Sequence, residues 1–309
     1  MSDNYVIKTE NLSKHYGKLK AVNQVSLNVK RGEIYGFLGL NGAGKTTTIR
    51  MLLGMIRPTS GSAYLKGEKV KAGNSELWKS VGYLVEIPYS YPDLTVLENL
   101  DLIRRLRFLN DRNSVKNIIE ILKLEQYREV LAKNLSLGNA QRLGLAKALI
   151  HKPEILLLDE PANGLDPSGI VEIREMLCDL AFNYGTTIFI SSHILGEISK
   201  FATRIGIIHD GLLIHESPAN EIDTLRKRCL HIKTKDLKGT KEILEMNGYQ
   251  PVISESGILE VSEEKALSNP ENIASILVLS GFPPSLLKTD EEDLEAFFMR
   301  VINTKGGKK

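Results

Sequence analysis

The spacing of apolar residues divides the chain into regions of different periodicity. Residues 5–80 alternate in the manner of β-strands, with Val25, Leu27 and Val29 on one face of a strand. From about residue 87 to 150 the apolar positions follow a helical period, and from about 155 to 215 short apolar runs alternate with helical segments. That last alternation is typical of a parallel sheet with crossover helices. The pattern therefore predicts an α/β fold with a helical insert.

The helical insert contains its own start signal. Thr95 and Glu98 have the spacing of a capping box, so we expect a helix to begin there. Its inward face would consist of Leu97, Leu100, Ile103 and Leu106. A second helix is expected over residues 118–124, where isoleucine and leucine recur at helical spacing.

Beyond Ser217-Pro218 the pattern changes to shorter elements. Strands are expected at residues 230–233 and 258–261, and helices at 241–246, 273–279 and 293–301. We therefore expect a small C-terminal α+β domain over residues 222–302, and a disordered tail over 303–309 whose lysines are solvated. Nothing in this small domain indicates catalysis, which leaves dimer contact or regulation as its expected role.

Composition limits the class of protein. A chain of 309 residues with 42% hydrophobic residues is long enough for one large domain and a small one. Its net charge of +2 gives no reason to expect nucleic acid as a partner. Cys178 and Cys229 lie far apart and lack metal spacing, so we expect inert thiols in a reducing cytosol.

The hydropathy of the chain gives no sign of a membrane span or a signal peptide. No apolar run approaches the roughly 18–20 residues that cross a bilayer. The N-terminal residues have neither the basic segment nor the apolar stretch of a secretory signal. We expect any membrane-spanning function to belong to a separate polypeptide.

Residues 39–46, with the sequence GLNGAGKT, match the phosphate-binding loop G-x-x-x-x-G-K-[ST]. A strand at 34–38 and a helix at 47–53 provide the context that distinguishes this motif from a chance glycine-rich turn. Glycines let successive N–H groups point inward at a helix N-terminus, where they bind anions. Lys45 would reach the β- and γ-phosphates, and the Thr46 hydroxyl would bind Mg²⁺. The expected nucleotide contacts are Gly39, Asn41, Gly42, Ala43, Gly44, Lys45, Thr46 and Thr47.

A second motif follows the apolar run at residues 155–158, which ends in Asp159 and Glu160. Such a run is typical of a strand buried in a parallel sheet, and ligands bind at the carboxyl ends of these strands. We expect Asp159 to hold Mg²⁺ against the phosphates and Glu160 to polarise the attacking water. A solvated acidic pair that caps a strand is the simpler alternative, and the phosphate loop weakens it.

Between these motifs, residues 135–142 have the sequence LSLGNAQR and open a helical pattern. Here the sequence resembles the nucleotide-binding subunits of ABC transporters, whose signature L-S-G-G-Q-x-Q-R opens a helix just before the Asp-Glu strand. This chain departs from the signature at Leu137 and Asn139. Ser136 is a good N-cap, and the helix start offers free N–H groups to an anion. In the family that anion is the γ-phosphate of ATP bound to the other subunit, so the resemblance assigns Ser136 and Gly138 to nucleotide binding.

Further positions match the family residue by residue. Tyr16 would stack on adenine, although an N-terminal tyrosine by itself is more often a core or surface residue. Residues 163–167 correspond to the D-loop at the dimer interface. His193, after the strand at 188–192, resembles the switch histidine that contacts the γ-phosphate. The remaining histidines have no such support: His15, His151, His209, His215 and His231.

Glu86 is a departure from the family, which has glutamine at this position to sense Mg²⁺, the attacking water and the membrane subunit. The resemblance makes Glu86 an expected metal ligand, together with Thr46 and Asp159. Glu86, the Ser-Leu-Gly of the signature and the NGLD of residues 163–166 together resemble the ATPases of lantibiotic-immunity and bacitracin-resistance transporters. Those bacterial exporters protect their host against antimicrobial peptides. The resemblance covers about residues 5 to 220.

The resemblance implies a P-loop NTPase fold of the ABC type over residues 1–220, beside the α+β appendage. That fold has a RecA-like core, an antiparallel β subdomain and a helical subdomain, here the insert at 87–150. It further implies ATP and Mg²⁺ as ligands, a homodimer around two nucleotides, and catalysis by Lys45, Glu160 and His193. The implied partner is a separate transmembrane permease, and the implied location is the cytoplasmic face of the cell membrane.

Three other classes of ATPase or ATPase-like protein fit the sequence less well. Soluble ABC-type ATPases that act on the ribosome usually carry two cassettes in one chain, whereas one copy of each motif is present here. A DNA-repair or chromosome ATPase would need a long heptad insert. A catalytically inactive scaffold is disfavoured because the four key side chains are in place: Lys45, Asp159, Glu160 and His193.

The resemblance also implies where the permease docks. In the family, a short cytoplasmic helix of the membrane subunit docks in a groove between the α/β core and the helical insert. Residues 86–92, with the sequence EIPYSYP, would line that groove. Tyr89 and Tyr91 would be amphipathic anchors there. The alternative is that both tyrosines pack the loop onto its own domain.

Overall fold

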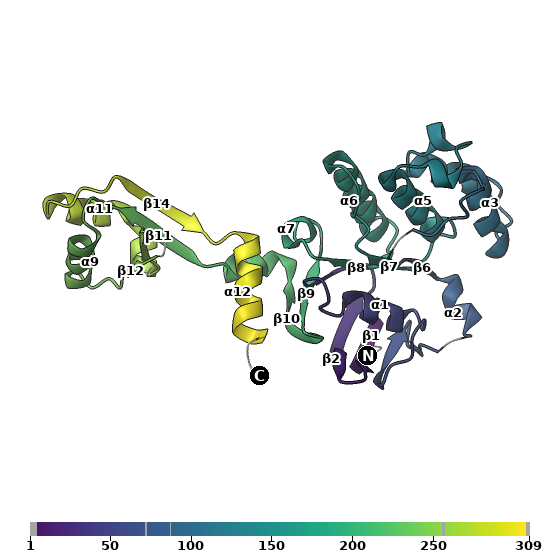
Figure 1. Cartoon of the computed structure of the whole chain (residues 1–309), viewed down its shortest axis with the longest axis horizontal. Helices are drawn as coiled ribbons and strands as arrows, with labels where there is room; N and C mark the ends of the chain where they lie inside the picture. The colour runs from purple at the N-terminus through teal and green to yellow at the C-terminus, as the bar shows by residue number, and fades with distance from the viewer. Residues whose placement is uncertain (1–4, 72, 87, 255–256, 307–309) are drawn as a thin grey trace. The chain divides into compact units, whose positions relative to one another are not determined.

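The computed structural model describes residues 5–71, 73–86, 88–254 and 257–306. Contacts within the chain divide these residues into two compact units (Figure 1). The first unit contains residues 5–220 together with 301–306, and the second contains Glu221–Arg300.

A six-stranded sheet in the order β10-β9-β3-β8-β7-β6 lies at the centre of the first unit. Strands β9, β3, β8, β7 and β6 pair in parallel, and β10 pairs antiparallel with β9. Figure 1 shows α5 and α6 on one side of this sheet and α1 on the other. Because both faces are covered, β3 and β7 are buried along their whole length, as their continuous apolar runs predict. The strands are β3 Ile34–Leu38, β6 Val81–Leu84, β7 Ile155–Asp159, β8 Thr187–Ser192, β9 Arg204–His209 and β10 Leu212–Pro218.

A second, antiparallel sheet in the order β2-β1-β4-β5 belongs to the same unit. Val25, Leu27 and Val29 of β2 are buried, which confirms that they share the inward face. Their side chains join the core that also contains Ile49 and Met51 of α1, and this core fixes the helix against the sheet. The strands are β1 Tyr5–Tyr16, β2 Leu19–Lys30, β4 Ser60–Leu65 and β5 Glu68–Lys69.

Helices complete the first unit and include the predicted insert. The capping box of Thr95 and Glu98 is present at the start of α3, as expected. Leu106 was expected to face inward, but its side chain is 60% exposed because α3 turns its last residue away from the core. The helices are α1 Lys45–Leu52, α2 Ser75–Lys79, α3 Val96–Leu106, α4 Asn113–Ile121, α5 Leu137–Leu149, α6 Pro167–Phe182 and α7 Leu195–Ile198. Short 3₁₀ turns occur at η1 Glu125–Tyr127, η2 Ala132–Asn134 and η3 Ala219–Glu221.

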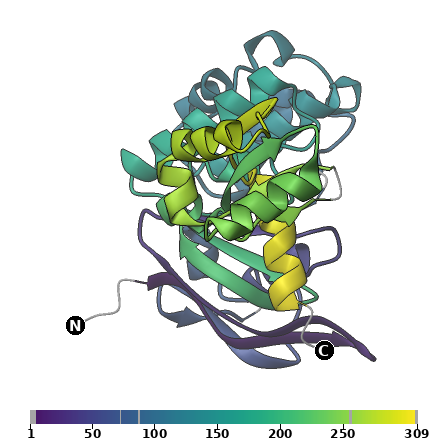
Figure 2. The same cartoon turned by 90° about the vertical axis from the view of Figure 1, so that its left-hand side faces the viewer.

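The second unit is an α+β structure around an antiparallel sheet in the order β12-β13-β11-β14. Helices α9, α10 and α11 cover one face of this sheet, where Leu230 and Leu259 pack against Leu244 and Ile273 (Figure 2). The strands are β11 Arg228–Lys233, β12 Val252–Ile253, β13 Leu259–Val261 and β14 Leu286–Glu291. The helices are α8 Ile222–Leu225, α9 Leu237–Met246, α10 Glu264–Ser268, α11 Pro270–Leu279 and the first part of α12 Leu294–Gly306, whose residues 301–306 belong to the first unit. The predicted fold class, an α/β core with a small α+β appendage, is therefore confirmed.

The predicted disordered tail at 303–309 is wrong for residues 303–306, because α12 continues to Gly306. Phe297, Phe298 and Val301 are buried and anchor this helix. Once a helix is nucleated, each added residue gains one hydrogen bond without a new nucleation cost, so the anchored helix extends into the polar segment. Residues 307–309 lie outside the described part of the chain. Among the described residues, none of the helices has the length and apolar character needed to cross a bilayer.

Asn99, a polar residue inside α3, organises the loop that leads into this helix. Apart from its place inside a helix, the sequence gives no sign of that role. Asn99 is buried, and its side-chain oxygen accepts a hydrogen bond from the Tyr91 backbone N–H at 2.9 Å. Its amide nitrogen donates to the carbonyls of Tyr91, Leu94 and Thr95 at 3.0–3.1 Å. One side chain thus satisfies several backbone groups of a loop that has no regular structure.

We expect Asn99→Ala to lower the free energy of unfolding by about 1–3 kcal/mol, because it leaves partly buried backbone groups without partners. Urea unfolding of the full chain measures this change. Asn117→Ala, at an exposed position of α4, is the matched control and should be neutral or slightly stabilising. Equal stability of the two variants would contradict the organising role of Asn99.

Candidate functional site

The loop at residues 39–46 joins the end of β3 to the start of α1, as the motif predicts. Its backbone needs glycine at Gly42 and Gly44, whose φ angles are +80° and +110°. At Gly44 an added Cβ would lie 2.4 Å from the Ala21 carbonyl oxygen, so no other residue fits. This curled backbone precedes the free N–H groups of the first turn of α1, which is the arrangement that binds phosphate.

The Lys45 side chain is buried and lies across this loop. Its Nζ donates to the carbonyl oxygens of Gly39 at 2.7 Å and Leu40 at 3.2 Å. The same atom lies 3.1 Å from Oε1 of Glu160. The cation is therefore held between the phosphate loop and the carboxylate that follows β7.

Asp159 is fixed by two hydroxyl groups from neighbouring elements. The Thr46 hydroxyl donates to one carboxylate oxygen at 2.6 Å, and the Ser191 hydroxyl donates to the other at 2.5 Å. Asp159 and Ser191 are paired in the parallel register of β7 and β8, and both are buried. These hydrogen bonds tie the phosphate loop, β7 and β8 to one another at the carboxyl edge of the sheet.

Glu160 follows directly and is surrounded by donors and positive charge. The Asn163 amide donates to its Oε2 at 2.8 Å, and Nδ1 of His193 lies 3.0 Å from the same oxygen. Burial raises the pKa of Glu160, but hydrogen bonds from Asn163 and Lys45 and the charges of Lys45 and His193 outweigh it, so the net pKa is lowered. Its backbone has φ +47°, a left-handed conformation that is uncommon for residues other than glycine.

The donor atoms at this edge fit Mg²⁺. A Thr46 hydroxyl and an Asp159 carboxylate 2.6 Å apart are hard oxygen ligands beside the anion-binding loop. Thr46, Glu86, Asp159 and Glu160 line one cavity of about 690 Å³. The carboxylate of Glu86, however, lies 2.6 Å from the Arg50 guanidinium of α1, so its charge already has a protein partner. Metal binding by Glu86 stays a prediction.

The other predicted residues lie elsewhere in the same unit. Ser136 caps α5 by accepting the Asn139 N–H at 3.3 Å, as expected. Gly138 lies against the D-loop, where an added Cβ would be 3.3 Å from the Gly164 carbonyl oxygen. Tyr16 ends β1 with its ring exposed and Lys14 Nζ 5.1 Å from the ring centroid. The predicted nucleotide contacts of Tyr16, Ser136 and Gly138 stay predictions.

Sequence reasoning overlooked the supporting side chains of the site. Ser191 had a usable signal, because it is a polar residue inside an apolar strand next to the Asp-Glu strand. Asn163 was placed in the D-loop, but its bond to Glu160 was not foreseen. The Gln141 amide donates to the Pro161 carbonyl at 3.0 Å, and Arg50 pairs with Glu86. No signal in the sequence connects either residue to its partner.

Comparison with known proteins agrees with this geometry. The family model described as ABC transporter matches residues 22–163. The bacitracin transport ATP-binding protein BcrA of Bacillus licheniformis is 40% identical over 301 residues, which cover 96% of this chain and 97% of the relative. The lantibiotic transport ATP-binding protein SrtF of Streptococcus pyogenes is 35% identical over 222 residues, which cover 72% of this chain and 95% of the relative.

Solved structures show the same cassette fold. A dimeric structure of a post-hydrolysis state of the ATP-binding cassette MJ0796, bound to ADP and Pi, superposes with a TM-score of 0.64 at 27% identity. The match covers 69% of this chain and 98% of that one. Cassettes of this family bind and hydrolyse ATP, dimerise, and work with membrane permease components. The predicted family, its fold and the resemblance to the bacitracin and lantibiotic branch are confirmed. The chain belongs to the ATP-binding subunits of ABC transporters.

Proposed function

We propose that this chain hydrolyses ATP to energise a bacterial exporter that removes antimicrobial peptides through a separate membrane permease. The observation that carries the proposal is the convergence of Lys45, Thr46, Asp159, Glu160 and His193 at one edge of the sheet. The names of the relatives BcrA and SrtF support the class of cargo. No observation favours a ribosomal target for the cassette.

In the proposed reaction Glu160 accepts a proton from the attacking water. Asn163 and His193 hold its Oε2, which leaves the carboxylate oriented toward the phosphate loop. Phosphate oxygens that approach Lys45 compete with Glu160 for the same cation, so nucleotide binding would raise the pKa of Glu160 and make it a stronger base. Mg²⁺, held by Thr46 and Asp159, would neutralise charge on the phosphates.

We further propose that the active form is a homodimer with composite sites. Ser136 and Gly138 lie at the free N-terminus of α5, where Gly138 is next to Gly164 of the D-loop, and neither residue is among the described hydrogen-bond partners of Asp159 and Glu160. That placement suits contact with a nucleotide bound to the loop of a second copy, because a helix N-terminus attracts a phosphate. Tyr16, with one exposed ring face, would stack on adenine.

The permease is proposed to dock in a groove of about 400 Å³ beside β6, α3 and α5. Pro88, Tyr89 and Tyr91 of the predicted docking segment line it, together with Ile103 and Leu106. Glu86 lines the cavity of the site instead, and Ile87 lies outside the described residues. Tyr89 is 74% exposed, which disfavours the alternative that it packs the loop onto its own domain. The apolar wall with tyrosine anchors suits an amphipathic helix, and it would place the subunit at the cytoplasmic face of the membrane.

The proposed base is tested by Glu160→Gln. We expect nucleotide binding to persist and the rate of hydrolysis to fall by roughly 10²-fold or more, because a general base is lost. Single-turnover hydrolysis of Mg·ATP measures the rate. Glu154→Gln, which alters an exposed carboxylate just before β7, should leave the rate unchanged. Near wild-type turnover in Glu160→Gln would refute the assignment.

The pairing of Glu86 with Arg50 is tested by a double-mutant cycle. Arg50→Ala leaves the Glu86 carboxylate uncompensated in the cavity that Thr46 and Asp159 line, so Mg²⁺ is attracted more strongly and the Mg²⁺ concentration for half-maximal hydrolysis should fall. The change should be at most about fivefold, because exposed ion pairs contribute about 1 kcal/mol or less. In the Glu86→Gln background, which should retain hydrolysis, Arg50→Ala should have little effect. An equal shift in both backgrounds would show that the two side chains act independently.

Docking is tested by the double substitution Tyr89→Ala with Tyr91→Ala. When the chain is expressed with its permease, we expect these changes to release it from the membrane fraction while ATP hydrolysis by the isolated subunit persists. Tyr184→Ala, at a similarly exposed tyrosine between α6 and β8, is the matched control and should remain membrane-bound. Membrane association that survives the double substitution would move the docking site elsewhere.

A further inference from the structure

The sheet of the second unit has one apolar face and one face with chemically reactive side chains. In the antiparallel register His231 of β11 lies opposite Glu260 of β13, and Cys229 lies opposite Asp290 of β14. Directly paired residues point to the same face of a sheet, and Cys229 and His231 are two residues apart on one strand. The four side chains therefore share the face that α9, α10 and α11 leave uncovered.

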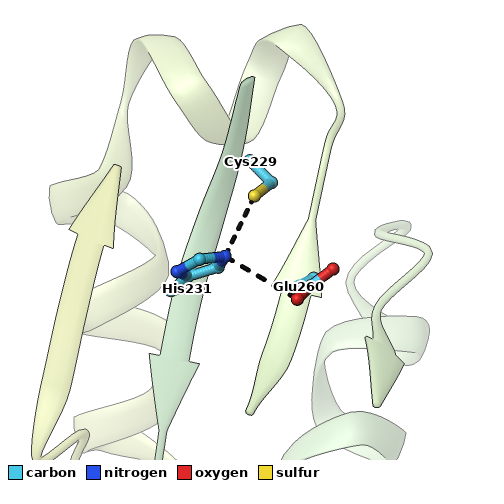
Figure 3. A group of neighbouring side chains, drawn as sticks. All are labelled: Cys229, His231 and Glu260. Atoms are coloured by element: carbon cyan, nitrogen blue, oxygen red, sulfur yellow. Dashed lines mark hydrogen bonds and ion pairs between the residues drawn. The ribbon is translucent and has the colours of Figure 1, made fainter. Parts of the chain in front are cut away.

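Three donor atoms of different kinds meet on that face (Figure 3). Sγ of Cys229 lies 3.1 Å from Nε2 of His231, and that nitrogen lies 3.7 Å from Oε1 of Glu260. All three donor atoms are within 4.8 Å of one another. In a tetrahedral zinc site with ordinary bond lengths, neighbouring ligand atoms are about 3.3–3.6 Å apart. Small side-chain rotations would bring all three atoms onto one ion.

The surroundings of His231 match those of a metal-bound histidine. Its second ring nitrogen, Nδ1, lies 3.7 Å from Oδ2 of Asp290. Metal-ligating histidines usually present their other ring nitrogen to a carboxylate, which sets the tautomer and the orientation of the ring. Asp290 is in turn paired with Lys288 at 3.0 Å.

The carboxylates on this face favour a cation. Glu260 and Asp290 flank His231, and Lys288 pairs with Asp290 at 3.0 Å. A divalent ion would neutralise the carboxylate of Glu260 and take the sulfur of Cys229 as a ligand.

We propose that Cys229, His231 and Glu260 bind one Zn²⁺, with Asp290 orienting the histidine. Sulfur, nitrogen and one carboxylate oxygen form a ligand set that suits Zn²⁺ and not the hard cations Mg²⁺ or Ca²⁺. Three protein ligands leave the fourth tetrahedral position to a water molecule. The ion would cross-link β11 to β13 in a unit that has no proposed part in ATP hydrolysis, so this site is independent of the proposed function. The proposal departs from the expectation that Cys229 is an inert thiol without metal spacing, because its proposed ligand partner Glu260 is brought close only by strand pairing.

Cobalt spectroscopy of the untagged full-length chain tests this site, because Co²⁺ occupies tetrahedral zinc sites and its bond to a thiolate absorbs light. After removal of metal with a chelator, we expect one equivalent of Co²⁺ to produce a thiolate charge-transfer band and tetrahedral d–d bands. One equivalent of Zn²⁺ should then abolish both. The charge-transfer band should disappear in Cys229→Ser and remain in Cys178→Ser, which alters the other cysteine of the chain.

Two further variants separate a metal site from an ordinary polar cluster. Asp290→Asn should keep the thiolate band but weaken Zn²⁺ binding by about 10–100-fold, as expected for a residue that orients a ligand. Glu260→Gln should weaken Zn²⁺ binding. In the presence of a chelator, its free energy of unfolding should equal that of the parent chain, because the side chain lies on the uncovered face. Absence of the band in the parent chain, or its survival in Cys229→Ser, would overturn the proposal.

Discussion

Asp159 and Glu160 place two negative charges at the end of a strand that is buried along its whole length, and the neighbouring side chains compensate both charges. Buried carboxylates are stable only when they are hydrogen-bonded or paired. Thr46 and Ser191 donate to Asp159, whereas Lys45, Asn163 and His193 surround Glu160. Since these donors come from the phosphate loop, the D-loop and β8, compensation of the two charges assembles the site.

Local signals were enough to predict the main elements. Some signals act within a few residues and can therefore be recognised in a linear sequence. They are the glycines of the phosphate loop, the apolar run of β7 and the capping box of α3. The family resemblance could be read for the same reason. These motifs also located Lys45 and Asp159 correctly at the carboxyl edge of the sheet.

The contacts that were missed depend on pairing between distant segments. Ser191 meets Asp159 through the register of β8 with β7, and Glu86 meets Arg50 of α1 from a position 36 residues further along the chain. Strand pairing also brings Glu260 to His231, across a gap in the sequence that no motif spans. Leu106 followed the helical period but is exposed, because periodicity identifies a face and not the length over which that face is covered.

In the proposed homodimer, each catalytic site combines the phosphate loop of one copy with the signature of another. Analytical ultracentrifugation of Glu160→Gln, with and without the further change Gly138→Asp, tests it most directly. With Mg·ATP, Glu160→Gln should sediment as a dimer, because the ATP that joins the two copies is not hydrolysed. Added Gly138→Asp should leave a monomer that still binds ATP, because its own loop is intact and only its contact with the partner's phosphate is lost. A dimer that forms equally well with Gly138→Asp, or without ATP, would contradict the account.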